Sequence, residues 1–180
     1  MAIYTKKGDF GKTGLADGKE IDKDDDVVEA YGTIDELNSL LGLVKSKITN
    51  ENVQKEIERI QKNLFTIGVE IAGGKREFKG IEYYEIDEIE KQIDVIENKI
   101  PKLNHFIIPG GETSASLVHF ARTVCRRCER KVVKVSKREK VRNEILVYLN
   151  RLSDFLFVLA REINYEKKIQ DVEWKGKKLL

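Results

Sequence analysis

The stretch Arg122-Thr-Val-Cys-Arg-Arg-Cys-Glu-Arg130 combines four arginines and a glutamate with apolar residues at helical spacing. A helix has about 3.6 residues per turn, so Arg122, Arg126 and Arg130 fall on or near one face. The other side is apolar and indicates a helix packed on a core: Val118, Ala121, Val124, Cys125, Cys128 and Val132. An arginine keeps its proton in a protein, so this row needs anionic partners. They are either carboxylates of another helix or a bound polyanion.

Apolar residues recur at spacings of three and four along five stretches, which cover residues 27–48, 53–72, 86–100, 113–135 and 141–165. The expected boundary residues are Asp24 to Asp26 at the start of the first helix, Gly73-Gly74 at the end of the second, and Thr113 or Ser114 as the cap of the fourth. No stretch shows a convincing strand pattern. The sequence therefore predicts an all-α fold, a five-helix bundle.

The 180 residues are enough for one domain with a sizeable core. We expect it to span residues 1–180, with an N-terminal arm at 1–23, the helical bundle at 24–165 and a solvated C-terminal tail at 166–180. Charged residues make up 36% of the chain, but the net charge is only +2, so bulk attraction to nucleic acid or to a membrane is not indicated. The chain lacks an apolar stretch of membrane-spanning length and an apolar signal core, which predicts a cytoplasmic protein.

Cys125 and Cys128 form the C-x-x-C pair of this chain. A zinc site would need about two further ligands, for which only His105 and His119 are available. Helical spacing of three places both sulfurs on the apolar side of the fourth helix. We therefore expect buried structural cysteines rather than a redox or metal site.

The N-terminal arm is rich in glycine, lysine and threonine, and reads Tyr4-Thr5-Lys6-Lys7-Gly8-Asp9-Phe10-Gly11-Lys12-Thr13-Gly14. Glycines let the backbone wrap closely, and successive amides can form an anion-binding nest. The spacing does not fit a Walker A loop, whose first glycine has no counterpart here. The arm is either a phosphate-binding segment or a basic tail.

A second unusual segment is the link at residues 102–112, which contains Phe106-Ile-Ile-Pro-Gly-Gly111. Three apolar residues stand here in a turn-rich loop, where polar residues are usual. The segment either plugs the end of the bundle or forms a wall of an apolar ligand site.

Charged residues at helical spacing also occur in the fifth and first helices. Asn150 and Asp154 share a face of the fifth helix, and Arg151 stands three residues before Asp154. Asp35 of the first helix is a candidate counter-charge for an arginine of the fourth. Each of these pairs is either a structural ion pair or part of a site.

Together these stretches resemble the PduO-type ATP:cob(I)alamin adenosyltransferases. Five blocks carry the resemblance in the order of the family: Thr5-Lys-Lys-Gly-Asp-Phe-Gly-Lys-Thr13; Lys23-Asp-Asp25 with Glu29-Ala-Tyr-Gly-Thr-Ile-Asp-Glu-Leu37; Phe106-Ile-Ile-Pro-Gly-Gly111; Arg122-Thr-Val-Cys-Arg-Arg-Cys-Glu-Arg130; and Leu149-Asn-Arg-Leu-Ser-Asp-Phe-Leu-Phe157. The resemblance implies a five-helix bundle that assembles as a homotrimer, with active sites between neighbouring subunits.

The resemblance also implies the residues of the site. Those implied for ATP are Thr5, Lys6, Lys7, Gly8, Thr13, Gly14 and Lys23 of the arm, Arg126, Arg127, Glu129 and Arg130 of the fourth helix, and Asn150 of the fifth. Those implied for the reaction itself are Asp35, Phe106, Arg122, Arg126 and Asp154. Asp35 and Arg122 would pair across the subunit boundary, and Phe106 would lie in the corrin pocket.

The implied reaction transfers the 5′-deoxyadenosyl group of ATP to the cobalt of reduced cobalamin and releases triphosphate. Co(I) is itself a strong nucleophile, so the protein needs no base, only alignment of the reacting atoms and stabilisation of the leaving charge. Phe106 would exclude water and a lower axial ligand from the cobalt. We predict no metal site built by the protein; Mg²⁺ would arrive with ATP, with Glu129 as its candidate protein ligand.

Two other functions stay open on the sequence: a non-catalytic helical nucleotide-binding regulator, and a carrier that delivers adenosylcobalamin to a dependent enzyme. A regulator gives no reason for the apolar link at residues 106–111. For the enzyme, the expected partners are ATP, cob(I)alamin, a flavin-type reductase and an adenosylcobalamin-dependent enzyme.

Overall fold

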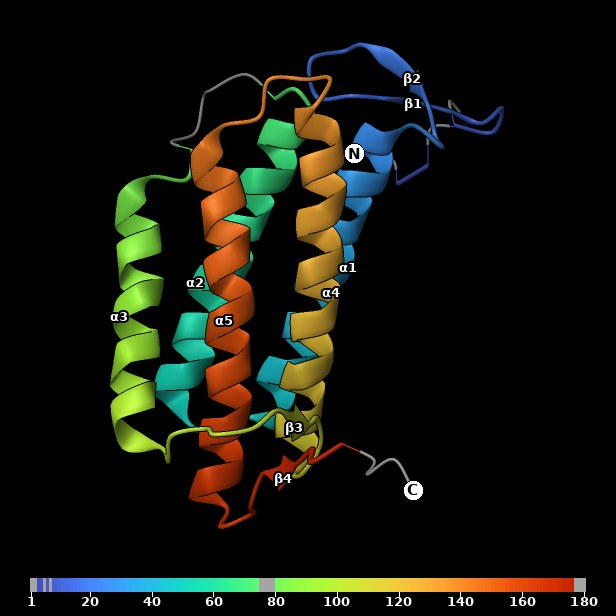
Figure 1. Ribbon diagram of the computed structural model, residues 1–180. Helices are drawn as coiled ribbons and strands as arrows, with labels where there is room; N and C mark the ends of the chain where they lie inside the picture. The colour runs from blue at the N-terminus through green and yellow to red at the C-terminus, as the bar shows by residue number, and fades with distance from the viewer. Residues whose placement is uncertain (1–2, 5, 7, 75–79, 177–180) are drawn as a thin grey trace.

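The computed structural model describes residues 3–4, 6, 8–74 and 80–176 of the chain. Its helices are α1 (Asp26–Lys47), α2 (Glu51–Ile71), α3 (Tyr83–Lys99), α4 (Thr113–Ser136) and α5 (Asn143–Glu166). They run lengthwise beside one another (Figure 1), and the packed pairs are α2 with α1, α1 with α4, α4 with α5 and α5 with α3. The predicted five-helix bundle is confirmed. Among the described residues, no helix combines the length and apolar character that spanning a bilayer requires.

The apolar residues that defined the helical pattern form one continuous core. The apolar face of α4 is buried throughout, at Val118, Ala121, Val124, Cys125, Cys128 and Val132. It packs against leucines of α1 and α5 that are also fully buried, such as Leu37, Leu41, Leu152 and Leu156. Burial of each such side chain contributes about 1.5–3 kcal/mol, so this core provides the main stabilisation of the bundle.

The helix boundaries agree with the sequence pattern except at the start of α4. Asp25 caps α1 through a hydrogen bond from the Val27 amide, as expected. The cap of α4 is Glu112, not Thr113 or Ser114, because its carboxylate reaches the amides of Ser114 and Ala115. A hydrogen bond from the Ser114 hydroxyl, and next those from the backbone amides at the helix N-terminus, lower the pKa of Glu112.

The expectation of no strands is wrong at both ends of the bundle. The arm folds as an antiparallel pair of β1 (Lys12–Gly14) and β2 (Glu20–Asp22), tied to the end of α2 by the Ala16 amide, which donates to the Ala72 carbonyl at 2.9 Å. These strands are too short to produce a recognisable alternation of apolar and polar residues.

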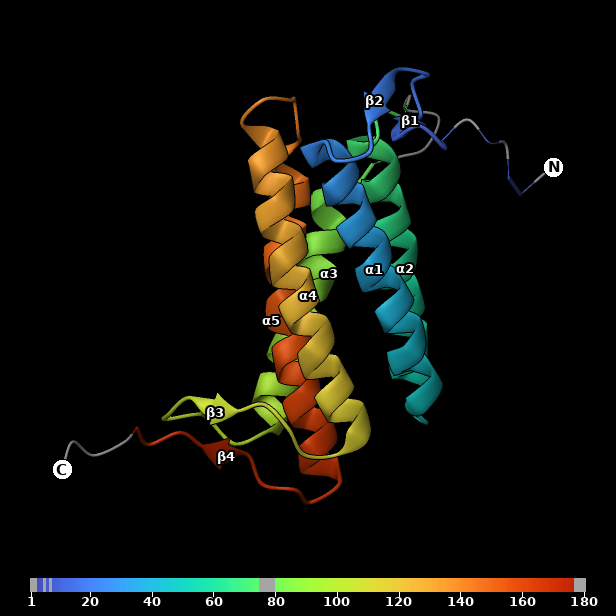
Figure 2. The same ribbon diagram turned by 90° about the vertical axis from the view of Figure 1, so that its right-hand side faces the viewer.

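The second pair joins the α3–α4 link, residues 100–112, to the C-terminal tail. β3 (Ile107–Ile108) pairs antiparallel with β4 (Val172–Glu173), and the Trp174 amide donates to the Phe106 carbonyl at 2.7 Å. The tail is therefore not simply solvated. The sequence did not predict this pairing, because strands more than 60 residues apart leave no local sequence pattern. The two strand pairs lie at opposite ends of the bundle (Figures 1 and 2).

Candidate active site

The cationic face of α4 is divided between paired and unpaired residues. Arg127 pairs with Glu36 of α1, and Lys131 pairs with Glu29 at 3.2 Å. Carboxylates of α1 thus pair with part of the positive charge on α4. Of the two alternatives for the arginine row, carboxylates of another helix are correct for Arg127.

Arg126 and Arg130 have no such partner. Both side chains are exposed, and neither makes an ion pair or hydrogen bond to any residue that the structure describes. They stand four residues apart, which is about 6 Å along the helix axis. Two unpaired guanidinium groups at this spacing can each bind an oxygen of a polyphosphate.

Arg122 is half-buried and lacks an acceptor for part of its guanidinium group. Its guanidinium carbon lies 5.9 Å from the centre of the Phe157 ring on α5, and its Nε is buried without a hydrogen-bond partner among the described residues. Burial, and then the neighbouring charge of Arg126, lower the pKa of Arg122. An anion at this position would relieve both effects.

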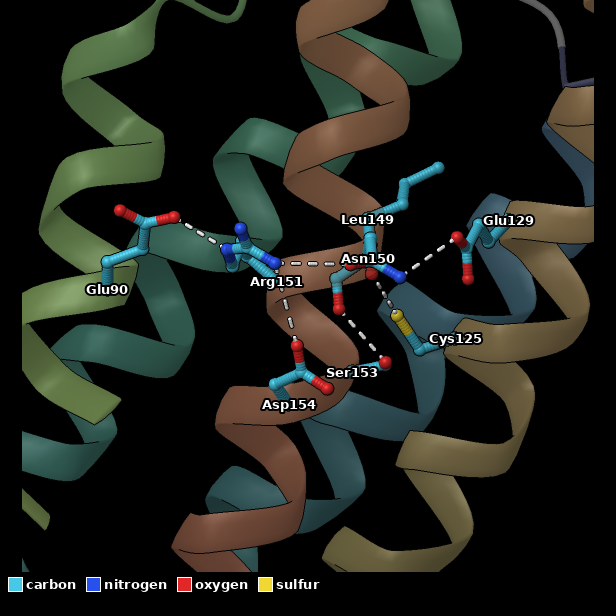
Figure 3. Close-up of polar contacts among 8 residues, drawn as sticks. All are labelled: Glu90, Cys125, Glu129, Leu149, Asn150, Arg151, Ser153 and Asp154. Carbon is cyan, nitrogen blue, oxygen red and sulfur yellow. Dashed lines mark hydrogen bonds and ion pairs between the residues drawn. The ribbon is translucent and has the colours of Figure 1, made fainter. Parts of the chain in front are cut away.

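Asn150 links the middle of α5 to the site face of α4. Its Nδ2 donates to the Glu129 carboxylate at 3.2 Å (Figure 3), which brings together two of the predicted ATP-binding residues. On the other side of α5, Arg151 pairs with Glu90 of α3 at 2.5 Å and lies 3.9 Å from Asp154. Asp154 is exposed, and among the described residues its one ion pair is this long contact, which does not involve the α4 arginines.

The two cysteines are buried, as predicted. Both are buried and free, and the Cys125 thiol donates to the Leu149 carbonyl of α5 at 3.4 Å (Figure 3). Burial raises the pKa of Cys128 to about 12 and that of Cys125 above its ordinary value. In the described part of the chain, no cluster of three or more His, Cys, Asp or Glu side chains could hold a metal ion.

Asp35 is exposed on α1 and makes no ion pair within the described residues. It lines a shallow groove of about 220 Å³ between α1 and α2, together with Tyr31, Phe65 and Val69. The Phe65 side chain is 66% exposed. Within the chain, Asp35 and Arg122 are not in contact.

The arm brings some of its predicted ligands together. Gly8 lies so close to Lys23 that a Cβ atom added at Gly8 would stand 3.0 Å from the Lys23 ammonium. Lys6 adopts a positive φ of 61°, and the Asp9 amide donates to its carbonyl at 3.4 Å. Thr13 and Gly14 form β1. Thr5 and Lys7 lie outside the described residues.

Phe106 directly precedes β3, which lies at the far end of the bundle from the arm (Figure 1), and the residue is 80% exposed. Along α4, which is about 36 Å long, the order is the Phe106 link, Arg122, Arg126, Arg130 and then the arm. The segment with the predicted corrin residue and the arm thus lie at opposite ends of the bundle, with the α4 arginines at levels between them. Sequence reasoning missed Phe157 beneath Arg122 and Trp174 beside Phe106, because both contacts join distant segments.

The described part of the chain is thus a helical bundle with two exposed, unpaired guanidinium groups on α4, a glycine-rich arm at one end and an exposed apolar loop at the other. The family model for cobalamin adenosyltransferase matches residues 3–163. The chain is 43% identical to the corrinoid adenosyltransferase of Bacillus subtilis (strain 168), over 97% of this chain and 92% of that protein. It is 41% identical to the corrinoid adenosyltransferase PduO of Citrobacter freundii, covering 92% of this chain but only 51% of that protein.

The fold comparison gives the same result. A variant of a PduO-type ATP:corrinoid adenosyltransferase from Lactobacillus reuteri, complexed with cobalamin and ATP, superposes with a TM-score of 0.91 at 36% identity, over 97% of this chain and 100% of that chain. The chain belongs to the cobalamin adenosyltransferase family.

Proposed function

We propose that the chain is an ATP:cob(I)alamin adenosyltransferase that moves the 5′-deoxyadenosyl group of ATP to cobalt and releases triphosphate. The observation that carries the proposal is the pair of unpaired arginines, Arg126 and Arg130, beside the linked Glu129 and Asn150. Two exposed guanidinium groups one turn apart, without a partner among the described residues, can bind oxygens of successive phosphates of a triphosphate.

The nucleotide would lie along α4, with its phosphates at Arg126 and Arg130. Lys23, next to Gly8, supports closure of the arm over the phosphates, since glycine allows close approach of the backbone to an anion. Asn150 would bind the nucleotide from α5. We assign Thr5 and Lys7 to the same arm contact on the resemblance alone.

The corrin would lie between the nucleotide and Phe106. The order of these residues along α4 supports this arrangement, because it places an exposed aromatic ring at the end of the row opposite the arm. A ring in that position would replace water or a lower axial ligand beneath the cobalt.

The reaction is a displacement at the 5′ carbon of the ribose. The electron pair of Co(I) forms the cobalt–carbon bond, the bond from that carbon to the phosphate oxygen breaks, and triphosphate leaves with the electron pair. Alignment of the two reacting atoms can supply about 7–11 kcal/mol of the barrier reduction. The arginines stabilise the charge on triphosphate as it forms.

Mg²⁺ would be bound mainly by the phosphates. The carboxylate of Glu129 is the acidic group nearest to Arg126 and Arg130 in sequence, and one carboxylate with phosphate oxygens is a usual set of ligands for Mg²⁺. The hydrogen bond from Asn150 would orient that carboxylate.

A second copy of the chain would complete each site in a homotrimer. Two observations support this: Asp35 is exposed beside apolar side chains that also lack cover, and Arg122 has a buried Nε without an acceptor. An Asp35–Arg122 pair between subunits would satisfy both groups. Three further points stay predictions: that the protein is cytoplasmic, that a flavin-type reductase supplies the electron, and that an adenosylcobalamin-dependent enzyme receives the product.

The test is an anaerobic assay with Mg-ATP and chemically reduced cobalamin, which follows the Co(I) absorbance and the light-sensitive product. We expect product with the wild-type chain and a large loss with Arg126→Ala. Lys134→Ala is the matched control, since Lys134 lies on the same helix but pairs with Asp26 at 2.8 Å. ATP binding without product would favour a nucleotide-binding regulator and overturn the proposal.

A further inference from the structure

Asn164, near the end of α5, holds the C-terminal half of the α3–α4 link. It is 97% buried, its Nδ2 donates to the Gly110 carbonyl at 2.9 Å, and its Oδ1 accepts from the Glu112 amide at 2.9 Å. Gly111 has a positive φ of 103°, and a Cβ there would lie 2.3 Å from Asn164. The close approach of Gly111 thus allows one side chain to satisfy two backbone groups.

Arg161, one turn earlier on α5, holds the other half of the link and the tail. Its side chain is only 6% exposed. Nη2 donates to the Pro101 carbonyl at 2.6 Å, and Nε donates to the Asp171 carboxylate at 2.8 Å. A single buried guanidinium group therefore joins α5, the start of the link and the tail.

Phe106 lies between these two anchors and has little packing of its own, since its side chain is 80% exposed. Its backbone is bound to the tail, through Trp174 and the pairing of β3 with β4. An aromatic ring without packing partners can hold a defined position only if its backbone is fixed. That backbone is fixed at Pro101 and along the tail through hydrogen bonds from Arg161. It is fixed at Gly110 through a hydrogen bond from Asn164.

We propose that Arg161 and Asn164 are positioning residues, which hold the link and the tail as one frame and so set where Phe106 meets the corrin. The inference rests on the proposed function, because it assigns Phe106 to the corrin side of that site. Neither side chain needs to touch substrate. Each acts through backbone groups at the two ends of the link.

The frame can be tested without any substrate. Trp174 is the single tryptophan of the chain and lies in the tail, so its fluorescence anisotropy reports whether the tail is held. We expect lower anisotropy in Asp171→Ala and in Asn164→Ala than in the wild-type chain. Lys99→Ala is the control: Lys99, the last residue of α3, pairs with Glu162 and Glu166 of α5 at 2.7 and 2.6 Å, and among the described residues it bonds to none of the groups that Arg161 and Asn164 hold.

The kinetic test separates positioning from general stability. A displacement of reacting groups by about 1 Å can cost on the order of a hundredfold, so we expect kcat/KM for the corrinoid to fall about tenfold to a hundredfold in both variants. The KM for ATP should change less than about twofold, because the α4 arginines and the arm lie away from this end. Lys99→Ala should leave both constants near the wild-type values.

Asp171→Ala keeps the test interpretable if Asn164→Ala fails to fold, since Asp171 is on the tail and outside the bundle. Its helix content should stay close to that of the wild-type chain, and its melting temperature should fall, because the buried Arg161 loses its carboxylate partner. Normal anisotropy and a normal kcat/KM for the corrinoid in Asp171→Ala and in a folded Asn164→Ala would overturn the inference. An inactive wild-type chain would instead overturn the proposed function, and the anisotropy result would still stand on its own.

Discussion

Arg122 lies over the ring of Phe157, with 5.9 Å between its guanidinium carbon and the ring centre, while its Nε is buried and has no acceptor in the part of the chain that the structure describes. The aromatic face compensates part of the desolvation of the charge, but a ring does not accept a directional hydrogen bond as a carboxylate does. The arrangement holds the guanidinium group in place and leaves one donor for a partner outside the chain.

The first prediction is that this partner is Asp35 of a second copy. Arg122→Asp or Asp35→Arg alone should weaken assembly, since loss of one member of a buried interfacial pair costs about 2–5 kcal/mol. The double reversal should restore much of the assembly. Sedimentation velocity across a dilution series measures the effect. Lys91→Asp, at an exposed α3 cation, is the control and should not dissociate the assembly.

If both single reversals assemble as well as the wild-type chain, the Asp35–Arg122 contact is not part of the interface. The exposed Phe65 and its neighbours in the groove would then need another partner.

The second prediction concerns the Asn150–Glu129 contact. Asn150→Asp would place a carboxylate about 3.2 Å from Glu129, and two carboxylates at the polyphosphate site would repel ATP. We expect the KM for ATP to rise at least about tenfold, which corresponds to about 1.4 kcal/mol. Steady-state kinetics at fixed reduced cobalamin measures it.

The matched control is Asn143→Asp, the same substitution at the exposed first residue of α5. A carboxylate is favourable at a helix N-terminus, so this variant should keep its KM for ATP and its stability. An equal rise in KM in both variants would mean that the effect is general electrostatics rather than the Asn150 contact.

The bundle could be predicted from the sequence because its pattern is local. Apolar residues at spacings of three and four fix which face of each helix is buried, and the residues from Val118 to Val132 on α4 lie in the core as expected. The cap at Glu112 was missed, because a long carboxylate can cap a helix when a preceding glycine turns the chain.

The site was predictable only in part. Helical spacing placed Arg126 and Arg130 on one face, but it could not separate them from Arg127, which pairs with α1. That division depends on which helix packs beside α4. The pairing of β3 with β4 depends on contacts between segments far apart in the chain, for which a single sequence contains no periodic pattern.

The third prediction is that Cys125 and Cys128 resist alkylation in the folded protein. Burial raises the pKa of Cys128 to about 12, so at pH 8 roughly one thiol in ten thousand is ionised, and the thiolate is the reactive form. Iodoacetamide labelling followed by mass spectrometry should show almost no modification before denaturation and two modified cysteines after it. Rapid labelling of the native protein would contradict the structural role.

The fourth prediction concerns His119, which is 3% exposed and has no hydrogen-bond partner for either ring nitrogen among the described residues. Burial, and next the charge of Arg122, lower its pKa to about 4, while Asp171 acts weakly in the opposite direction. The unfolded chain therefore binds this proton more readily than the folded one between about pH 6.5 and pH 4. The contribution of neutral His119 to the free energy of unfolding is fully present above pH 6.5 and declines as the pH falls toward 4.

Protonation of this one group should lower the free energy of unfolding by about 3 kcal/mol near pH 4, because the pKa of His119 falls from 6.5 to about 4 on folding. His119→Leu removes the titrating ring, so the free energy of unfolding of the variant should depend less steeply on pH between 6.5 and 5, where most carboxylates are still ionised. Urea unfolding at several pH values measures both slopes. Equal slopes in the two proteins would mean that His119 is protonated in the folded chain, and the buried ring would then need an acceptor that the fold does not supply.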